Sequence, residues 1–274
     1  PVENVFSGVM DWVKKDIPNC RGFWAPDIHH FNGRYGLYYS ASSFGSQRSI
    51  IGLATNVTLN PADPNYRWVD EGKVIESQEG MAYNAIDAGI VTDTEGRLWM
   101  SFGSFWDGIK MIELNPETGK PLSDKPEVLS LARRPVSPNA IEAPHIIYRK
   151  GYYYLFVSFD YCCRRADSTY KIMVGRSKEV VGPYADKDGI EMLKGGGTLL
   201  LESSERWKGP GHNSILSDNG KDYLVYHTYD ADSRGMPVLQ IRPLSWTEDG
   251  WPVAGELLEG LTLSEEQRAV PRLR

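Results

Sequence analysis

One sequence pattern occurs four times along the 274-residue chain and limits what the chain can fold into. Each copy is a turn led by glycine, followed directly by a run rich in Tyr, Phe and Trp. A short apolar run precedes each turn, and a run of small or β-branched residues follows it. The copies begin at Gly33, Gly96, Gly151 and Gly220, with spacings of 63, 55 and 69 residues. This repetition predicts a unit of several antiparallel strands.

The repeats predict an all-β fold of the β-propeller type, in which each copy forms one blade. No segment holds a 3.6-residue apolar period over three turns, which argues against a helical fold. A β-sandwich is the alternative, but it would not readily produce four similar motifs at wide and nearly regular spacing. The stretch 116–138 is interpreted as a surface excursion between blades, so residues 1–274 are expected to form a single domain.

Charge and hydropathy exclude two classes of partner. Thirty Lys and Arg against 36 Asp and Glu leave a net charge of −6 without a basic stripe, which argues against nucleic-acid binding. No apolar run approaches the ~18–20 residues that a helix needs to cross a bilayer, so no membrane partner is expected. The chain opens with PVENVFSG, which has no signal-peptide character.

The three cysteines cannot form a disulfide framework, because one is always left over. Cys162 and Cys163 are adjacent, and Cys20 lies far from both in sequence. No pair has the spacing of a zinc site. Two free thiols under a loop are the favoured interpretation of the adjacent pair, and a vicinal disulfide is the alternative.

Polar residues stand at the start of the run that would form the innermost strand of each blade. Such positions converge at one end of a propeller channel, and here they hold Asp27, Asp87, Glu142 and His212. Their distances to the following glycine are 6, 9, 9 and 8 residues, so the equivalence is closer for Asp87 and Glu142 than for Asp27. Buried charge is costly unless something compensates it. Three carboxylates at matching positions therefore indicate function, although each alone could be structural.

Paired carboxylates at a wet cleft are what glycoside hydrolysis requires, since one donates a proton to the leaving oxygen and another activates water or attacks. Glu142 has the most apolar local sequence and is the candidate general acid. Asp87 is the candidate for tuning and orienting it. Aromatic residues near these positions fit sugar binding, and the candidates are Trp24, Phe44, Phe105 and Trp106.

Seven ordered motifs resemble glycoside hydrolase family 43, and within it the endo-1,5-α-L-arabinanases. They are WAPDI, YYSASSFG, NAID, MSFGSFW, IEAPHI, CCRRADSTY and GHNS, which run from Trp24 to Ser214. The resemblance implies a five-bladed propeller, arabinan as substrate, and hydrolysis of internal bonds with inversion. It implies Glu142 as general acid and Asp87 as its tuning carboxylate. It also implies roles beside the sugar for Trp24, Phe44, Asn84 and Ser104, and a calcium ion on the channel axis at His212.

The chain departs from the family pattern at the general base. In the family this Asp lies in an N-terminal blade before the WAPD segment, and no matching motif stands in residues 1–23. We expect the chain to lack this blade and its base, with about four blades present and little or no hydrolysis by the chain alone. A four-bladed enzyme with Asp27 as a surrogate base is the less favoured hypothesis.

Two other functions stay open at this point. One is an exo-acting arabinofuranosidase or xylosidase of the same family, which loop heights would distinguish. The other is a non-catalytic carbohydrate-binding propeller, which would keep the aromatic residues and lose the base. The resemblance further implies a secreted protein, with an intracellular oligosaccharide-processing form as the alternative, and we expect a monomer.

Overall fold

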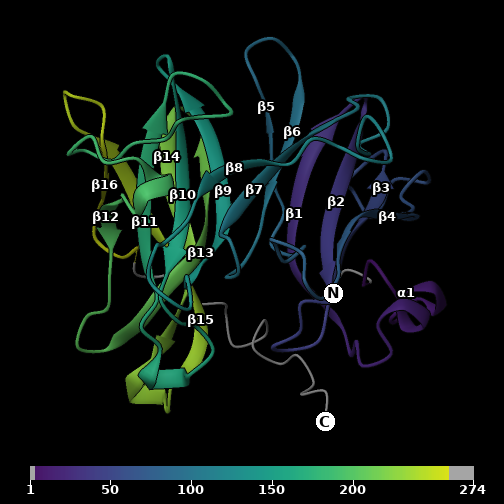
Figure 1. Ribbon diagram of the computed structural model, residues 1–274, viewed down its shortest axis with the longest axis horizontal. Helices are drawn as coiled ribbons and strands as arrows, with labels where there is room; N and C mark the ends of the chain where they lie inside the picture. The colour runs from purple at the N-terminus through teal and green to yellow at the C-terminus, as the bar shows by residue number, and fades with distance from the viewer. Residues whose placement is uncertain (1–3, 259–274) are drawn as a thin grey trace.

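The computed structural model describes residues 4–258, which fold into four antiparallel sheets of four strands each. Within each sheet the strands follow one another in chain order. The sheets are arranged as the blades of a β-propeller, as the repeats predict, with blade 1 at the right of Figure 1 and blades 3 and 4 at the left.

In each blade the first and second strands lie on either side of a turn glycine. Blade 1 contains β1 (Phe23–Phe31), β2 (Arg34–Ala41), β3 (Ser49–Asn56) and β4 (Val69–Ser77). Blade 2 contains β5 (Gly89–Thr92), β6 (Leu98–Phe102), β7 (Ile109–Leu114) and β8 (Leu129–Ala132). Blade 3 contains β9 (Ile141–Arg149), β10 (Tyr152–Phe159), β11 (Lys171–Ser177) and β12 (Thr198–Leu201). Blade 4 contains β13 (Trp207–Asp218), β14 (Lys221–Asp230), β15 (Met236–Trp246) and β16 (Pro252–Ala254).

The few helical segments are short and lie outside the sheets. They are α1 (Asp11–Asp16), η1 (Arg165–Asp167), η2 (Met192–Lys194) and η3 (Ala231–Ser233). Val13 of α1 is fully buried and packs with Ala41 and Ile50 of blade 1. In the described part of the chain, no helix has the length and apolarity to span a membrane.

The hydrophobic cores lie between neighbouring blades, because central strands such as β10 bury both of their faces. In β10, Tyr153, Leu155 and Val157 belong to the core shared with blade 2. The alternate residues Tyr154 and Phe156 belong to the core shared with blade 4. Successive side chains of a strand point to opposite faces, so one aromatic-rich strand supplies two cores.

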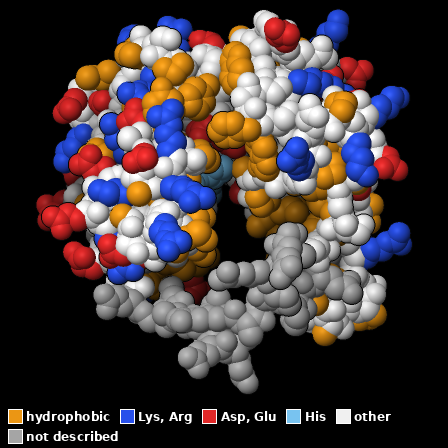
Figure 2. Space-filling view, turned by 90° about the horizontal axis from the view of Figure 1, so that it is seen from below, with side chains coloured by type: hydrophobic (Ala, Val, Ile, Leu, Met, Phe, Trp, Pro, Cys, Tyr) orange, Lys and Arg blue, Asp and Glu red, His pale blue; other side chains and the backbone are white. Residues whose placement is uncertain are grey.

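The first strands of the blades are neighbours around the axis, with β1 against β5, β5 against β9, and β9 against β13. Gly89 permits the close approach of β5 to β9, because a Cβ atom there would lie 2.3 Å from the Pro144 carbonyl oxygen. Figure 2 shows the molecule from below, with a central opening between the blades. Hydrophobic side chains lie on both sides of the opening, and a histidine lies on its wall.

Candidate active site

A non-glycine residue in the left-handed backbone region lies in or just before each innermost strand, upstream of its regular pairing. These residues are Ala25, Asp87, Ala143 and His212, with φ angles of 42°, 62°, 57° and 49°. The strand pairing skips at this point in blades 1, 3 and 4, as in a β-bulge. Bulges redirect side chains and are common beside active sites. The three bulges and the left-handed residue Asp87 therefore direct polar side chains of these strand starts toward the channel mouth.

The bulges also correct the predicted equivalence of the three carboxylates. Trp24 pairs with Ser40 and Glu142 pairs with Ser158, so Trp24 and Glu142 occupy the same repeat position. Asp87 stands one residue later, at the left-handed position. Asp27 pairs with Tyr38 in the regular strand beyond the bulge, as His145 does with Phe156 in blade 3. The three carboxylates thus occupy three different positions of the repeat, which glycine offsets could not resolve.

Serine hydroxyls fasten the left-handed residues to the preceding blade. The Asp87 amide donates to Ser40 Oγ at 3.0 Å, and the His212 amide donates to Ser158 Oγ at 2.8 Å. The sequence analysis did not identify these serines. Both come seven residues after a turn glycine, which is the signal that would have found them.

Asp87 and Glu142 meet at the seam between blades 2 and 3, as the sequence analysis predicts. Asp87 is 6% exposed, and its Oδ2 accepts a hydrogen bond of 3.2 Å from the amide of Ala143, the residue after Glu142. Glu142 is 9% exposed, and its Oε2 accepts a hydrogen bond of 2.5 Å from Ser104 Oγ. Ser104 is held opposite Glu142 by an isolated backbone bridge. The two carboxyl groups are thus positioned by the starts of β5 and β9 and by the segment that follows β6.

Burial and mutual repulsion determine the protonation of this pair. Burial raises the pKa of Glu142, and the Asp87 charge raises it further, whereas the Ser104 hydrogen bond and His212 oppose the rise. Burial also raises the pKa of Asp87, against the hydrogen bond from the Ala143 amide. Two close carboxyl groups in a dry site cannot both ionise easily. The pair therefore retains a proton to higher pH than an exposed carboxyl group does.

Asp27 lies at a different seam, between blades 1 and 2. Its Oδ2 accepts a hydrogen bond of 2.9 Å from the amide of Ile90. Burial raises the pKa of Asp27 to about 7, against hydrogen bonds from the Ile90 and Ile28 amides. No charge of Glu142 or Asp87 contributes to this shift. The carboxyl group is thus tied to the neighbouring blade and is largely protonated below neutral pH.

His212 is the predicted metal ligand, and it lies among other histidines of the channel. Burial lowers its pKa, and Glu142 opposes that change. His145 Nε2 accepts a hydrogen bond of 3.2 Å from the Ile215 amide, and its pKa falls to about 4 through burial and the charge of His212. These imidazoles are neutral near pH 7 and keep a lone pair.

The donor set fits calcium poorly. Across residues 4–258, no group of three or more His, Cys, Asp or Glu side chains is arranged to hold a metal ion. Calcium takes six to eight oxygen ligands, so a site at His212 would depend on water for nearly all of them.

The predicted sugar contacts divide into exposed and buried residues. Phe44 is 86% exposed on the loop after β2, and Trp24 is half-buried at the start of β1. Asn84 is buried, and its Oδ1 accepts hydrogen bonds from Ser49 at 2.7 Å and Ser77 at 3.4 Å. The Asn84 side chain therefore joins strands of blade 1 to the segment that carries Asp87.

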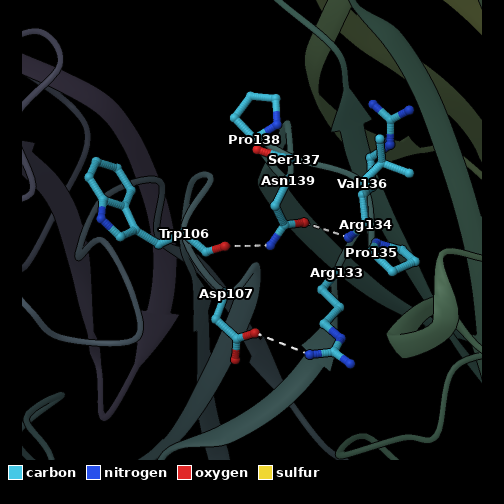
Figure 3. A pocket seen from close by; sticks show the side chains of 9 residues that line it. All are labelled: Trp106, Asp107, Arg133, Arg134, Pro135, Val136, Ser137, Pro138 and Asn139. Carbon is cyan, nitrogen blue, oxygen red and sulfur yellow. Dashed lines mark hydrogen bonds and ion pairs between the residues drawn. The ribbon is translucent and has the colours of Figure 1, made fainter.

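A pocket of about 400 Å³ lies between the β6–β7 loop and the β8–β9 loop, beside the segment that carries Ser104 (Figure 3). Asn139 joins the loops, since its Nδ2 donates to the Trp106 carbonyl at 2.6 Å. Arg133 donates to Asp107 at 3.4 Å across the pocket. The Trp106 indole points away from these polar groups in Figure 3 and is 38% exposed.

Cys162 and Cys163 form a vicinal disulfide, and the favoured interpretation as free thiols is wrong. Cys20 is the free cysteine and is buried. Adjacency keeps the two sulfur atoms within bonding reach in the β10–β11 loop, a geometry that sequence spacing could not distinguish from a reduced pair.

Comparison with known proteins identifies the family of the chain. The family model described as glycosyl hydrolases family 43 matches residues 3–252. The extracellular endo-α-(1→5)-L-arabinanase 1 of Bacillus subtilis is 47% identical, over 91% of this chain and 74% of its own length. The extracellular exo-α-(1→5)-L-arabinofuranosidase ArbA of Cellvibrio japonicus is 45% identical, over 93% of this chain and 76% of its own length. The structure of a Cellvibrio cellulosa α-L-arabinanase complexed with arabinohexaose matches with a TM-score of 0.88 and 45% identity, covering 92% of this chain and 83% of that one.

Proposed function

The chain belongs to glycosyl hydrolase family 43, and we propose that it hydrolyses internal α-1,5-L-arabinofuranosidic bonds of arabinan with inversion. The 47% identity to an endo-arabinanase supports this reaction. The likeness to an arabinanase that holds arabinohexaose supports an arabino-oligosaccharide as the molecule in the cleft.

The observation that carries the proposal is the buried Glu142 carboxyl group beside Asp87. Glu142 donates its proton to the glycosidic oxygen as the bond to the anomeric carbon breaks, and water adds to that carbon from the opposite face. Asp87 keeps Glu142 protonated before the reaction through its negative charge and its hydrogen bond to Ala143. Ser104 Oγ orients the acid and stabilises the carboxylate left after proton transfer.

The water requires a general base, and Asp27 suits that role poorly. The Asp27 Oδ2 atom already accepts a hydrogen bond from the Ile90 amide, so this oxygen is not free to take a proton from water. Asp27 also lies after the bulge of β1, whereas Trp24 lies before it, as Glu142 lies before the bulge of β9. We therefore assign Asp27 to holding blades 1 and 2 together and not to the role of general base.

Sugar binding is assigned to the aromatic residues at the mouth. Trp24 shares the repeat position of Glu142, which places it at the same end of the channel. The exposed ring of Phe44 and the half-exposed indole of Trp106 extend this surface on either side. Endo action rests on the similarity to the named endo-arabinanase.

Secretion is proposed because the two arabinan-active relatives are named as extracellular proteins, and a monomer is proposed as the working state. The family resemblance alone is the ground for proposing calcium at His212, since the side chains there supply few of the oxygen ligands that calcium takes. Such an ion would be structural and held largely by water, and no step of the reaction passes through it.

Product analysis on linear and branched arabinan tests the proposal. Oligosaccharides of mixed length from linear arabinan support endo action, whereas arabinose or a disaccharide alone would establish exo action. The control is Glu142→Ala, which should abolish products while retaining affinity for the oligosaccharide. Binding by the wild type without any product would identify a carbohydrate-binding protein and contradict the proposal.

A further inference from the structure

The Cys162–Cys163 disulfide takes no part in the proposed reaction, yet it lies close to the catalytic pair. It follows β10, in which Ser158 pairs with Glu142. The Asp160 amide donates to the Ala140 carbonyl at 3.0 Å, so the chain is still fastened to the β9 segment just before the disulfide. The loop thus leaves the sheet at the end of the channel where the general acid stands.

The loop is also connected to the aromatic rim of the mouth. The ring of Tyr161, directly before Cys162, lies 6.0 Å from the ring of Phe105 between their centroids. The Phe105 amide donates to the Ile141 carbonyl at 2.9 Å, beside Glu142. Phe105, Tyr161 and the disulfide therefore follow one another outward from the catalytic seam.

Several hydrogen bonds fix the disulfide in place. The Cys163 amide donates to Tyr229 Oη at 2.8 Å, which joins the loop to blade 4. The Arg164 amide donates to Ser168 Oγ at 3.0 Å, and the Thr169 amide donates to the Tyr161 carbonyl at 2.8 Å. The Arg164 guanidinium lies over the Tyr161 ring at 4.0 Å and covers that aromatic face.

The disulfide presents an apolar surface to solvent at this position. Cys163 is exposed and Cys162 is half-buried. Bonded sulfur atoms have no hydrogen to donate and are polarisable, so they contact carbon–hydrogen groups favourably. The two side chains are bonded to each other, so contact with a ligand costs them little conformational entropy.

Resting on the proposed function, we propose that the Cys162–Cys163 ring is a sugar-binding platform that receives an arabinofuranose unit remote from the cleaved bond. The carbon–hydrogen face of the furanose lies on the sulfur atoms, while the exposed Arg165 and Asp167 beside them offer a donor and an acceptor for its hydroxyl groups. Such a platform acts on long oligosaccharides and not on those too short to reach it.

The test compares affinities for linear α-1,5-linked arabinotriose and arabinohexaose by titration calorimetry, in the Glu142→Ala background so that neither is consumed. Adding Cys162→Ser with Cys163→Ser should weaken hexaose binding about threefold to tenfold and leave triose binding unchanged. Cys20→Ser is the matched control, since it removes the buried free thiol. Reducing the disulfide should reproduce the loss for the hexaose, and reoxidation should restore the affinity.

Unchanged hexaose affinity in the double serine variant would overturn the platform. An equal loss of affinity for triose and hexaose would also overturn it, because the disulfide would then only maintain the fold. In that case the double serine variant should also show a lower unfolding temperature. Cleavage of either oligosaccharide by Glu142→Ala would instead contradict the proposed function and leave the affinity comparison intact.

Discussion

Two seams of the propeller, between blades 1 and 2 and between blades 2 and 3, contain the same kind of hydrogen bond but differ in chemistry. At each, a carboxylate accepts a hydrogen bond from a backbone amide of the next blade, Asp27 from Ile90 and Asp87 from Ala143. Burial raises the pKa of both carboxyl groups. Only Asp87 has a second carboxyl group beside it, that of Glu142, which also has a serine donor. Burial alone gives Asp27 a raised pKa and a structural hydrogen bond to the next blade. Burial together with the charge of Asp87 gives Glu142 the properties of a general acid.

The largest expected effect is on kcat, and it should differ between substitutions at the two seams. Glu142→Gln should lower kcat for linear arabinan by about 10³-fold, because general acid catalysis of this kind contributes 10²–10⁴-fold. Asp27→Asn should lower it by less than about tenfold, because the amide oxygen can still accept from Ile90. Steady-state rates of the two variants measure the difference. Equal losses of kcat in the two variants would show that Asp27 takes part in the reaction, and the proposed difference between the two seams would be wrong.

Asp87→Asn should have the next largest effect, a fall in kcat of about 10²-fold. Removing the Asp87 charge lowers the Glu142 pKa, because repulsion no longer favours the protonated acid. The acid works only when protonated, so the basic limb of the kcat/KM profile should move to lower pH. A profile that keeps its position would contradict the assigned coupling.

Ser104→Ala provides the opposite shift and a smaller loss, about tenfold in kcat. The Ser104 hydrogen bond lowers the Glu142 pKa by stabilising the ionised form, so its removal raises that pKa. The basic limb of the pH profile should then move to higher pH. Ser101→Ala is the matched control, since Ser101 Oγ donates to the Gly89 carbonyl and does not contact Glu142.

The smallest expected effect concerns stability at the blade 1–2 seam. The folded-state pKa of Asp27 is raised to about 7, so its contribution to stability is complete below the unfolded pKa of ~3.9 and is lost as the pH rises through 7. Asp27→Asn removes this loss and should raise Tm by roughly 2–4 °C at pH 8. Thermal unfolding at about pH 3 serves as control, because Asp27 is protonated in both the folded and the unfolded state there, and the variant should gain nothing over the wild type.

The blades could be predicted from sequence because the signals are local. A glycine turn followed by an aromatic run marks one hairpin, and four such marks indicate the propeller. The burial of Glu142 and Asp87 could be predicted because apolar residues flank both in the sequence. These inferences need only a short stretch of chain around each residue.

The register of the site could not be predicted, because the bulge residues are Ala25, Asp87, Ala143 and His212 rather than glycine. Sequence marks a left-handed position mainly through glycine or asparagine. Contacts between blades place these residues, so counting back from the turn glycine wrongly gave Asp87 and Glu142 the same repeat position. The disulfide was missed for a related reason, since adjacent cysteines read the same whether bonded or reduced.

The location of the cores between blades has a consequence for folding kinetics. Each blade is a meander whose strand pairs are close in the chain, and such local contacts form early. The cores and the Asp87–Glu142 pair require two blades to dock, as at the contact of Gly89 with Pro144. Refolding should therefore recover strand content in a phase that precedes activity. A substitution at Gly89 should slow the second phase and leave the first unchanged.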